Sequence, residues 1–519
     1  MFLLLLFVQL VTCSAADHFK TACSALQHHI NLPNVTVNFA EFVPAKSNIS
    51  LIDNPVSCGQ SYQTLLGGDI CRVAMSITTS DRSGLTAEMW LPRDYTGRFL
   101  STGNGGLAGC IQYQDMAYGT MLGFATVGAN NGHNGTSGAA FLNNPEVLAD
   151  FAYRSLHTGV VVGKKITTEF YPEGYKKSYY LGCSTGGREG WKSVQRFPRD
   201  FDGVVAGSPA FNFVNLNSWG LYLNNITGPM GSPTSLTEVQ WTAVQKEVIR
   251  QCDGIDGALD GLIEDPSLCQ PILETLICTP KANRTTCLTG TQANSVRQVL
   301  SPFYGPDGTL YYPQMNPGVE ASSFGLYYNG LPPLYPAQWY QDVVLSNPNW
   351  DYTTWTLDDA AVALAQNPFD IETYDANIAE FQNVGGRVLH YHGMQDPLIS
   401  SESSKLYYRK VAESMNLAPS ELDEFYRFFT ISGMSHCAPG TGPSYIGQGI
   451  GTYVSSDPED NVLMAMVKWV EEGIAPETVR GSTMKDNKVE YRRRHCRYPK
   501  RNVYKGPGGY EDENAWECI

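Results

Sequence analysis

The sequence has no apolar run of membrane-spanning length after its first residues, no internal repeat and no low-complexity tract. The first absence argues against an integral membrane protein, and the others argue against a repeat or biased-composition architecture. Positive charge is also scarce, with 36 Lys and Arg residues against 51 Asp and Glu residues and a net charge of −15. This balance argues against a nucleic-acid partner, although it does not identify a substrate.

The remaining composition is that of an ordinary globular protein, with 42% hydrophobic and 17% charged residues. The length of 519 residues exceeds the usual size of a single hydrophobic core. We therefore expect either one large domain that carries an insertion or two domains.

Residues 1–16 form a short apolar run that ends in small residues, which is typical of a secretory signal peptide cut near Ala15 or Ala16. A membrane anchor would need a longer apolar stretch, and a basic segment before the run is lacking. The sequence therefore predicts a secreted, extracellular protein with no membrane partner.

Glycosylation sequons and cysteines agree with secretion. One of the 13 cysteines, Cys13, lies in the predicted signal peptide, so cleavage leaves an even number that can form six disulfides in an oxidising compartment. The Asn-x-Ser/Thr sequons predict N-glycosylation at Asn34, Asn48, Asn134, Asn225 and Asn283.

Strand patterns alternate with helix patterns in the first 200 residues. Short β-branched and aromatic runs separated by Gly, Pro and Asn turns predict strands up to about residue 120. Apolar positions at helical spacing over 144–171 predict a helix, and a strand follows at 177–182. This order predicts an α/β fold with a mostly parallel sheet flanked by helices.

The middle of the sequence, residues 209–380, is rich in Asn, Pro, Tyr and Trp and shows little regular alternation of strands and helices. The strand-then-loop pattern returns at about residue 386, and residues 460–473 predict an amphipathic helix. We predict a catalytic domain formed by 17–208 and 381–519, with 209–380 inserted over its sheet as a lid.

The motif Gly182-Cys183-Ser184-Thr185-Gly186 fits G-x-S-x-G between a predicted strand and a predicted helix. In this context the motif indicates a nucleophile elbow, where the turn exposes the Ser184 hydroxyl and presents the next backbone N–H at a helix start. A glycine-rich turn with an incidental serine is the alternative.

A serine nucleophile needs a base, and the base needs an orienting carboxylate, in the chain order Ser, acid, His. Asp396 follows a predicted strand, although it could also be an ordinary Asp-Pro turn residue. His436 lies in a loop after another apolar run. His133, His390 and His392 are competing histidines, and we interpret them as buried structural residues.

Cysteines lie next to both the predicted nucleophile and the predicted base. A Cys183–Cys437 disulfide would tie the two catalytic loops together and hold Ser184 near His436. Positioning matters here because small displacements of catalytic groups are costly. The alternative is that both cysteines pair elsewhere.

The Cys-Ser, Asp and His-Cys pattern resembles the signature of the tannase and feruloyl esterase family, which are secreted serine esterases. The similarity extends over nearly the whole mature chain and is greatest to the fungal type B feruloyl esterases. Blocks that carry it include "GRFLSTGNGGLAGCIQY", "SYYLGCSTGGREG" and "QCDGIDGALDGLIEDP". The resemblance implies an α/β-hydrolase core with a large inserted lid.

Such an enzyme would work through an acyl-enzyme on Ser184, with His436 as general base and acid and Asp396 orienting the imidazole. The oxyanion would be stabilised by the Thr185 amide and by a second donor from the "GNGG" loop, either Gly105 or Gly106.

A calcium site is predicted in the lid. Asp253, Asp256 and Asp260 lie close together on a glycine-rich loop, and Ca²⁺ accepts carboxylate and carbonyl oxygens. A run of Asp-Gly turns explains the spacing equally well. The resemblance favours structural calcium, with the carbonyls of Ala258 and Leu262 as further ligands. No organic cofactor is expected.

The remaining cysteines are expected to form five further disulfides. Cys252 and Cys269 flank the acidic loop, and Cys278 and Cys287 would close a small ring. The resemblance implies the pairs Cys23–Cys71, Cys58–Cys110 and Cys496–Cys518, which the sequence alone could not choose.

The expected substrate is a feruloylated plant cell-wall polysaccharide or a small phenolic ester. Aromatic residues concentrated in the lid suit a cleft for a phenolic acyl group, although they also suit an ordinary core. Two alternatives remain open, a tannase acting on galloyl esters and a catalytically silent carbohydrate-binding glycoprotein.

Overall fold

The computed structural model describes residues 18–51, 54–319 and 330–519. The predicted signal peptide, 1–16, lies outside these described residues. Within them, no helix combines the length and the apolar character needed to cross a membrane.

The chain forms two compact units. The first contains the described residues up to Ser137, Asn144–Leu181 and Asp200–Asp202, and the second contains Gly138–Asn143, Gly182–Arg199 and everything from Gly203 onward. The chain crosses between the two units at several points, one of which lies within the strand β8 (Lys177–Cys183), between Leu181 and Gly182.

These units do not follow the predicted domain boundaries, because segments 209–380 and 381–519 fall together in the second unit. Side-chain contacts join the two segments. Lys405 forms an ion pair with Asp265, and the Ser400 hydroxyl donates to the carbonyl of Gln314. The prediction of an inserted lid at 209–380 stays a prediction.

The first unit is built on a mixed sheet with the strand order β1-β4-β5-β7-β6-β8. Its other elements are β1 (Val35–Val43), β2 (Asn48–Ser50), β3 (Tyr62–Thr64), β4 (Ile70–Ser80), β5 (Ser83–Pro92), β6 (Arg98–Thr102), β7 (Phe124–Ala129), α2 (Tyr113–Met121), α3 (Pro145–Ala149) and α4 (Ser155–Phe170). The β1, β4 and β5 strands run antiparallel, and β6 pairs in parallel with both β7 and β8. The sheet is antiparallel where a tight turn joins β4 to β5 and parallel where helices connect the strands.

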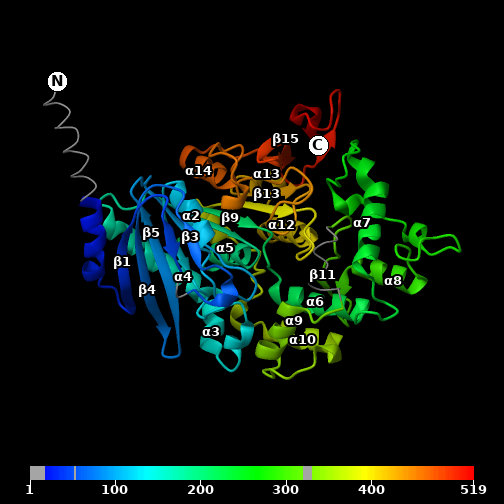
Figure 1. The fold of residues 1–519 in the computed structure, drawn as a ribbon, viewed down its shortest axis with the longest axis horizontal. Coiled ribbons are helices and arrows are strands. Elements are labelled where there is room, and N and C mark those ends of the chain that lie inside the picture. Colours follow the sequence, from blue (N-terminus) through cyan, green and yellow to red (C-terminus); the bar gives the residue numbers. More distant parts are fainter. Residues whose placement is uncertain (1–17, 52–53, 320–329) are drawn as a thin grey trace. The chain divides into compact units, whose positions relative to one another are not determined.

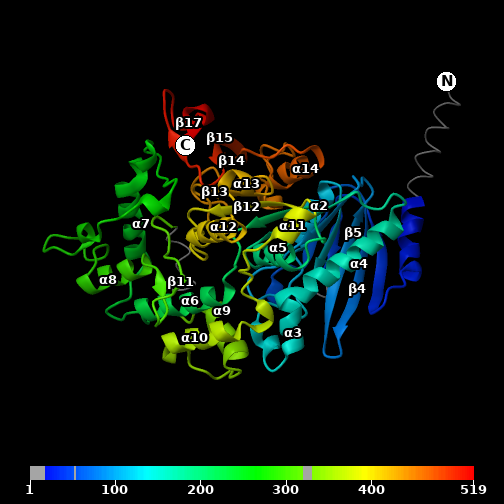
Figure 2. The same cartoon turned by 180° about the vertical axis from the view of Figure 1, so that it is seen from behind.

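Two helices cover opposite faces of this sheet. A Cβ on Gly119 of α2 would contact Leu100, whereas a Cβ on Gly163 of α4 would contact Phe99. Since neighbouring residues of a strand point to opposite faces, α2 and α4 must lie on different sides. Figure 2, the view from behind, shows α4 lying across the face of the sheet that is turned toward the viewer.

The second unit contains three parallel strands in the order β9-β12-β13 and the helices around them. Its elements up to residue 383 are α5 (Thr185–Arg196), β9 (Gly203–Gly207), α6 (Phe213–Thr227), α7 (Glu238–Cys252), α8 (Gly290–Val299), β10 (Phe303–Tyr304), β11 (Leu310–Tyr312), α9 (Leu334–Trp339), α10 (Leu357–Gln366) and α11 (Ala379–Asn383). The later ones are β12 (Arg387–Gly393), α12 (Ser401–Met415), α13 (Pro419–Leu422), β13 (Tyr426–Ile431), α14 (Val462–Glu472), β14 (Thr478–Lys485), β15 (Lys488–Cys496), β16 (Asn502–Tyr504) and β17 (Trp516–Cys518).

Helices α5 and α14 pack on β9, and α12 and α14 pack on β12. Residues 209–380 contribute mainly helices, with α6 packed against α8, α9 and α10 (Figure 1). The predicted helix at 460–473 corresponds to α14, whose apolar face is buried and whose cap is Asn461.

Candidate active site

Ser184 occupies the single residue between β8 and α5. Its backbone has φ 63° and ψ −124°, a conformation that residues other than glycine rarely adopt. The Ser184 N–H donates to the carbonyl of Gly207, and the Ser184 carbonyl accepts from the N–H groups of Arg188 and Ala210, each at 3.0 Å. These bonds hold a sharp strand-to-helix turn and leave Ser184 half-buried.

Close packing beneath the turn depends on Gly187. A Cβ at this position would lie 2.4 Å from the carbonyl oxygen of Gly207 and 2.9 Å from Cα of Pro209. Since real Cβ atoms do not approach backbone this closely, glycine is required for α5 to lie directly against the end of β9.

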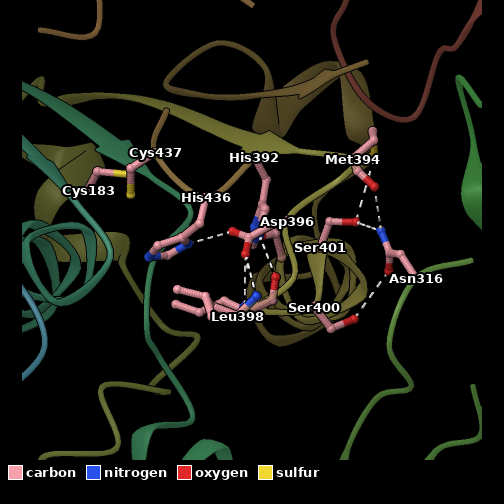
Figure 3. A network of polar contacts seen from close by, with 12 residues as sticks. Cys183, Asn316, His392, Met394, Asp396, Leu398, Ser400, Ser401, His436 and Cys437 are labelled. Carbon is pink, nitrogen blue, oxygen red and sulfur yellow. Dashed lines mark hydrogen bonds and ion pairs between the residues drawn. A yellow bond between two sulfur atoms is a disulfide. The ribbon is translucent and has the colours of Figure 1, made fainter. Parts of the chain in front are cut away.

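Asp396 and His436 follow the carboxyl ends of β12 and β13, which are neighbouring parallel strands. The ends of parallel strands meet at one edge of the sheet, so their loops lie together. His436 Nδ1 lies 2.7 Å from Asp396 Oδ2 (Figure 3). The backbone N–H of Gln395 donates to the carbonyl of Met434, which joins the two loops directly.

The environment of Asp396 keeps its carboxylate ionised. The side chain is fully buried, and Oδ1 accepts the N–H groups of Leu398 and Ile399 at 2.9 and 3.0 Å. Burial alone would raise the pKa, but the charge of His436 and the hydrogen bonds from His436 and His392 outweigh it and hold the pKa of Asp396 well below its ordinary value. An anionic Asp396 is suited to fixing the His436 tautomer with Nδ1 protonated, which leaves Nε2 as the basic nitrogen.

The Cys183–Cys437 disulfide is present, with Cα atoms 6.0 Å apart. It joins the residue before Ser184 to the residue after His436, so the two loops are covalently tied. The structure also contains the five pairs that were expected, namely Cys23–Cys71, Cys58–Cys110, Cys252–Cys269, Cys278–Cys287 and Cys496–Cys518.

The oxyanion donors were predicted at Thr185 and at Gly105 or Gly106. Thr185 is buried at the first position of α5, directly after Ser184. Gly105 and Gly106 follow β6 in the first unit, and Gly106 has a φ of 56°. The choice between the two glycines stays a prediction.

The competing histidines are buried and hydrogen-bonded. His133 Nε2 lies 2.8 Å from the carbonyl oxygen of Leu107, and His390 and His392 are fully buried in β12. The sequence interpretation missed one contact, since His392 Nε2 lies 3.2 Å from Asp396 Oδ2. The sequence spacing offered a signal for this contact. His392 lies near the end of β12, and the predicted acid, Asp396, follows four residues later in the loop after that strand.

The predicted calcium loop follows α7. Asp256 is buried, and burial together with the charges of Glu264 and Asp260 raises its pKa to about 7. Such crowded carboxylates fit a hard cation. Asp253 Oδ1 accepts the N–H groups of Asp260 and Gly261, and Asp260 Oδ2 pairs with Arg493 at 2.7 Å. Within the described part of the chain, no three His, Cys, Asp or Glu side chains converge as a metal centre, and calcium stays a prediction.

Parallel strands with intervening helices, a strained serine turn and an Asp–His pair beyond later strands define the α/β-hydrolase class. The family model "Tannase and feruloyl esterase" matches residues 71–330 and 336–519. The chain belongs to the tannase and feruloyl esterase family.

Similar proteins agree over nearly the whole length. "Probable feruloyl esterase B-2" of Neosartorya fischeri is 62% identical over 97% of this chain and 96% of its own. The crystal structure of an esterase from Aspergillus oryzae, at 61% identity, and that of feruloyl esterase B from the same organism, at 58%, both superpose with a TM-score of 0.95. Each comparison covers 96% of this chain and all of the other. The predicted α/β-hydrolase core and the predicted family are confirmed.

Proposed function

We propose that this protein is a carboxylic ester hydrolase that releases ferulate and related hydroxycinnamates from their esters. The proposal rests on the strained backbone turn at Ser184, together with the hydrogen bond between Asp396 and His436. Relatives about 60% identical over nearly the full length are named feruloyl esterases, which specifies the acyl group.

The chemistry follows from the roles that the three residues would take as a Ser-His-Asp triad. Ser184 Oγ attacks the ester carbonyl while His436 Nε2 takes its proton, and the Asp396 carboxylate stabilises the imidazolium that forms. His436 then protonates the departing alcohol, which leaves a feruloyl ester on Ser184. Water attacks this acyl-enzyme in a second step with the same proton transfers, releasing ferulic acid and free Ser184.

The negative oxygen of each tetrahedral intermediate needs preorganised donors. We assign the backbone N–H of Thr185 to this role because it directly follows the nucleophile at a helix start. The second donor would be the N–H of Gly105 or Gly106.

A feruloylated plant cell-wall polysaccharide or a smaller phenolic ester would supply the substrate. Tannase activity on galloyl esters is the alternative, since the family's description covers both enzymes. The same catalytic residues serve both reactions, so the residues that line the acyl pocket would decide between them.

Secretion and N-glycosylation form part of the proposal. Six disulfides suit an oxidising compartment. The predicted acceptors Asn34, Asn48, Asn134, Asn225 and Asn283 are all exposed, as glycan attachment requires. Structural calcium would be held by Asp253, Asp256, Asp260 and the carbonyls of Ala258 and Leu262, where its charge would offset the crowded carboxylates.

Hydrolysis of methyl ferulate beside methyl gallate tests the proposal, with the Ser184→Ala variant as control. We expect ferulate turnover that falls by at least about 10⁴-fold in the variant. A preference for gallate would assign the protein to tannase. Labelling with a fluorophosphonate tests the third possibility, because a silent carbohydrate-binding protein would not react at Ser184.

A further inference from the structure

A line of buried polar side chains runs from the carboxylate of Asp396 into the core of the second unit. His392 Nε2 lies 3.2 Å from Asp396 Oδ2 and 3.0 Å from the carbonyl oxygen of Ile399. His392 Nδ1 lies 2.6 Å from Ser404 Oγ, which in turn lies 2.9 Å from His390 Nε2.

The line ends at a tyrosine. His390 Nδ1 lies 2.9 Å from the hydroxyl of Tyr426, which comes from the neighbouring strand β13. All five side chains are fully buried, at 0% exposure, so bulk water does not complete their hydrogen bonds. We call this line, Tyr426–His390–Ser404–His392–Asp396, the buried relay. Figure 3 shows His392 and His436 approaching Asp396 together.

The acceptors at the outer end fix which nitrogen of His392 carries a proton, and for a neutral His392 this sets the direction of the other hydrogen bonds. The carbonyl of Ile399 and the ionised carboxylate of Asp396 only accept, so His392 must carry its proton on Nε2. Nδ1 of a neutral His392 is therefore an acceptor, and Ser404 donates its hydroxyl proton to it.

The same reasoning extends to the inner end. Because the Ser404 hydroxyl proton points to His392, Ser404 Oγ accepts from His390 Nε2, and Tyr426 donates to His390 Nδ1. All four bonds run in one direction, from the phenol to the catalytic carboxylate. Aligned hydrogen bonds in a low-dielectric interior polarise one another, so each strengthens the donor that finally reaches Asp396.

The surroundings keep the inner groups neutral. The rings of Trp191, Phe211 and Phe428 pack around His390, and burial holds its pKa well below the ordinary value. Burial also raises the pKa of Tyr426. The titratable groups that face the relay are Asp396 and His436 at the outer end, and Tyr374, Tyr407, Tyr408 and Tyr498 around Tyr426. Neutral imidazoles and phenols can hold the fixed donor directions described above.

We propose that His392 is a positioning residue for the Asp396–His436 pair and that the buried relay holds its donor in place. This inference rests on the proposed roles of Asp396 and His436 but not on the identity of the acyl group. The Nε2–H of His392 shares the negative charge of the oxygen that faces His436 and restrains rotation of the carboxylate.

Two effects follow when this donor is removed. The carboxylate gains rotational freedom, and a catalytic pair that is displaced by up to about 1 Å loses up to about 100-fold in kcat. The charge on Oδ2 is also less shared, so it stabilises the protonated, imidazolium form of His436 more strongly. The acid limb of the kcat/KM profile should therefore move to higher pH.

The test compares His392→Leu, which removes the donor, with His392→Gln, which retains an amide N–H. The substrate is 4-nitrophenyl acetate, so that a wrong acyl assignment does not affect the result. We expect His392→Leu to lower kcat by at least about tenfold, with little change in KM and with the acid limb at higher pH. His392→Gln should recover part of both.

Smaller deletions cover the case in which His392→Leu does not fold. Tyr426→Phe removes only the terminal hydroxyl and should move the acid limb in the same direction by less. The matched control is Tyr408→Phe, whose buried hydroxyl bonds Asp423 at 3.1 Å and lies outside the relay. An acid limb unchanged in both His392→Leu and Tyr426→Phe, or moved equally in Tyr408→Phe, would overturn the proposal. Inactivity of the wild-type enzyme on every ester would instead overturn the proposed function.

Discussion

Cys183 and Cys437 are joined by a disulfide, although 254 positions separate them in the sequence. The bond places Ser184 and His436 on two loops that cannot separate. The backbone bonds from Ser184 to Gly207 and from Gln395 to Met434 reinforce the arrangement from either side. Covalent and hydrogen-bonded ties therefore converge on the three candidate catalytic residues.

Removing this disulfide should lower activity beyond its effect on folding. The double variant Cys183→Ala/Cys437→Ala frees the two loops, and we expect kcat to fall about tenfold or more in protein that is still folded. The measurement is kcat on methyl ferulate well below the melting temperature of the variant. Cys278→Ala/Cys287→Ala, which opens a ring with a separation of only 9, serves as the control and should keep its kcat. Wild-type turnover in the folded first variant would refute the positioning role.

Gly187→Ala should destabilise the protein. Its methyl group would meet the carbonyl of Gly207 at 2.4 Å, so α5 must move away from β9. Overpacking of this kind costs about 1–3 kcal/mol, and the displaced helix start should also reduce turnover. Thermal unfolding and kcat check both effects. Gly290→Ala, at a helix position with open space around the added methyl group, is the matched control and should cause neither.

Glu372 should make stability depend on pH. Burial raises its pKa to about 8, and its carboxylate oxygen accepts the N–H of Val214 at the start of α6. The unfolded chain loses this proton near pH 4 while the folded protein retains it to about pH 8, so the folded state binds more protons between these values. The contribution of Glu372 to stability is therefore fully present below about pH 4 and is lost as pH rises toward 8.

Glu372→Gln mimics the protonated side chain and removes this dependence. When melting temperatures are measured from pH 4 to 8, the melting temperature of the variant should rise relative to that of the wild type as the pH increases. Glu380→Gln, at an exposed position of α11, should follow the wild type throughout. Parallel curves for the wild type and Glu372→Gln would contradict the prediction.

Calcium should stabilise the protein if the acidic loop binds it. A ligand present at 100 times its Kd adds about 2.7 kcal/mol to the free energy of unfolding, so chelation with EGTA should lower the melting temperature. Asp256→Asn should abolish the response to added calcium. Asp307→Asn is the control, because Asp307 makes a similar turn, with Oδ1 accepting the N–H of Thr309, at an exposed position away from the predicted ligands. Equal melting temperatures with calcium and with EGTA would exclude a structural site.

The sequence by itself determined the local features of this protein. The apolar, β-branched run at 70–80 became β4, the apolar stripe at 460–473 became α14, and G-x-S-x-G became the turn between β8 and α5. These features depend on side-chain periodicity and backbone restrictions within a few residues, so they can be inferred without the fold. The cysteines beside Ser184 and His436 additionally indicated which distant loops meet.

The tertiary structure decided what depends on packing between distant segments. In the folded protein His392 lies against Asp396. The line of hydrogen bonds continues from His392 through Ser404 of α12 and His390 to Tyr426 of β13. The tertiary structure also paired Arg493 with Asp260 and joined 209–380 to 381–519 in one compact unit. Apart from the four-residue spacing of His392 and Asp396, no local pattern encodes these contacts, because the others depend on how strands and helices far apart in the sequence align when the core is buried.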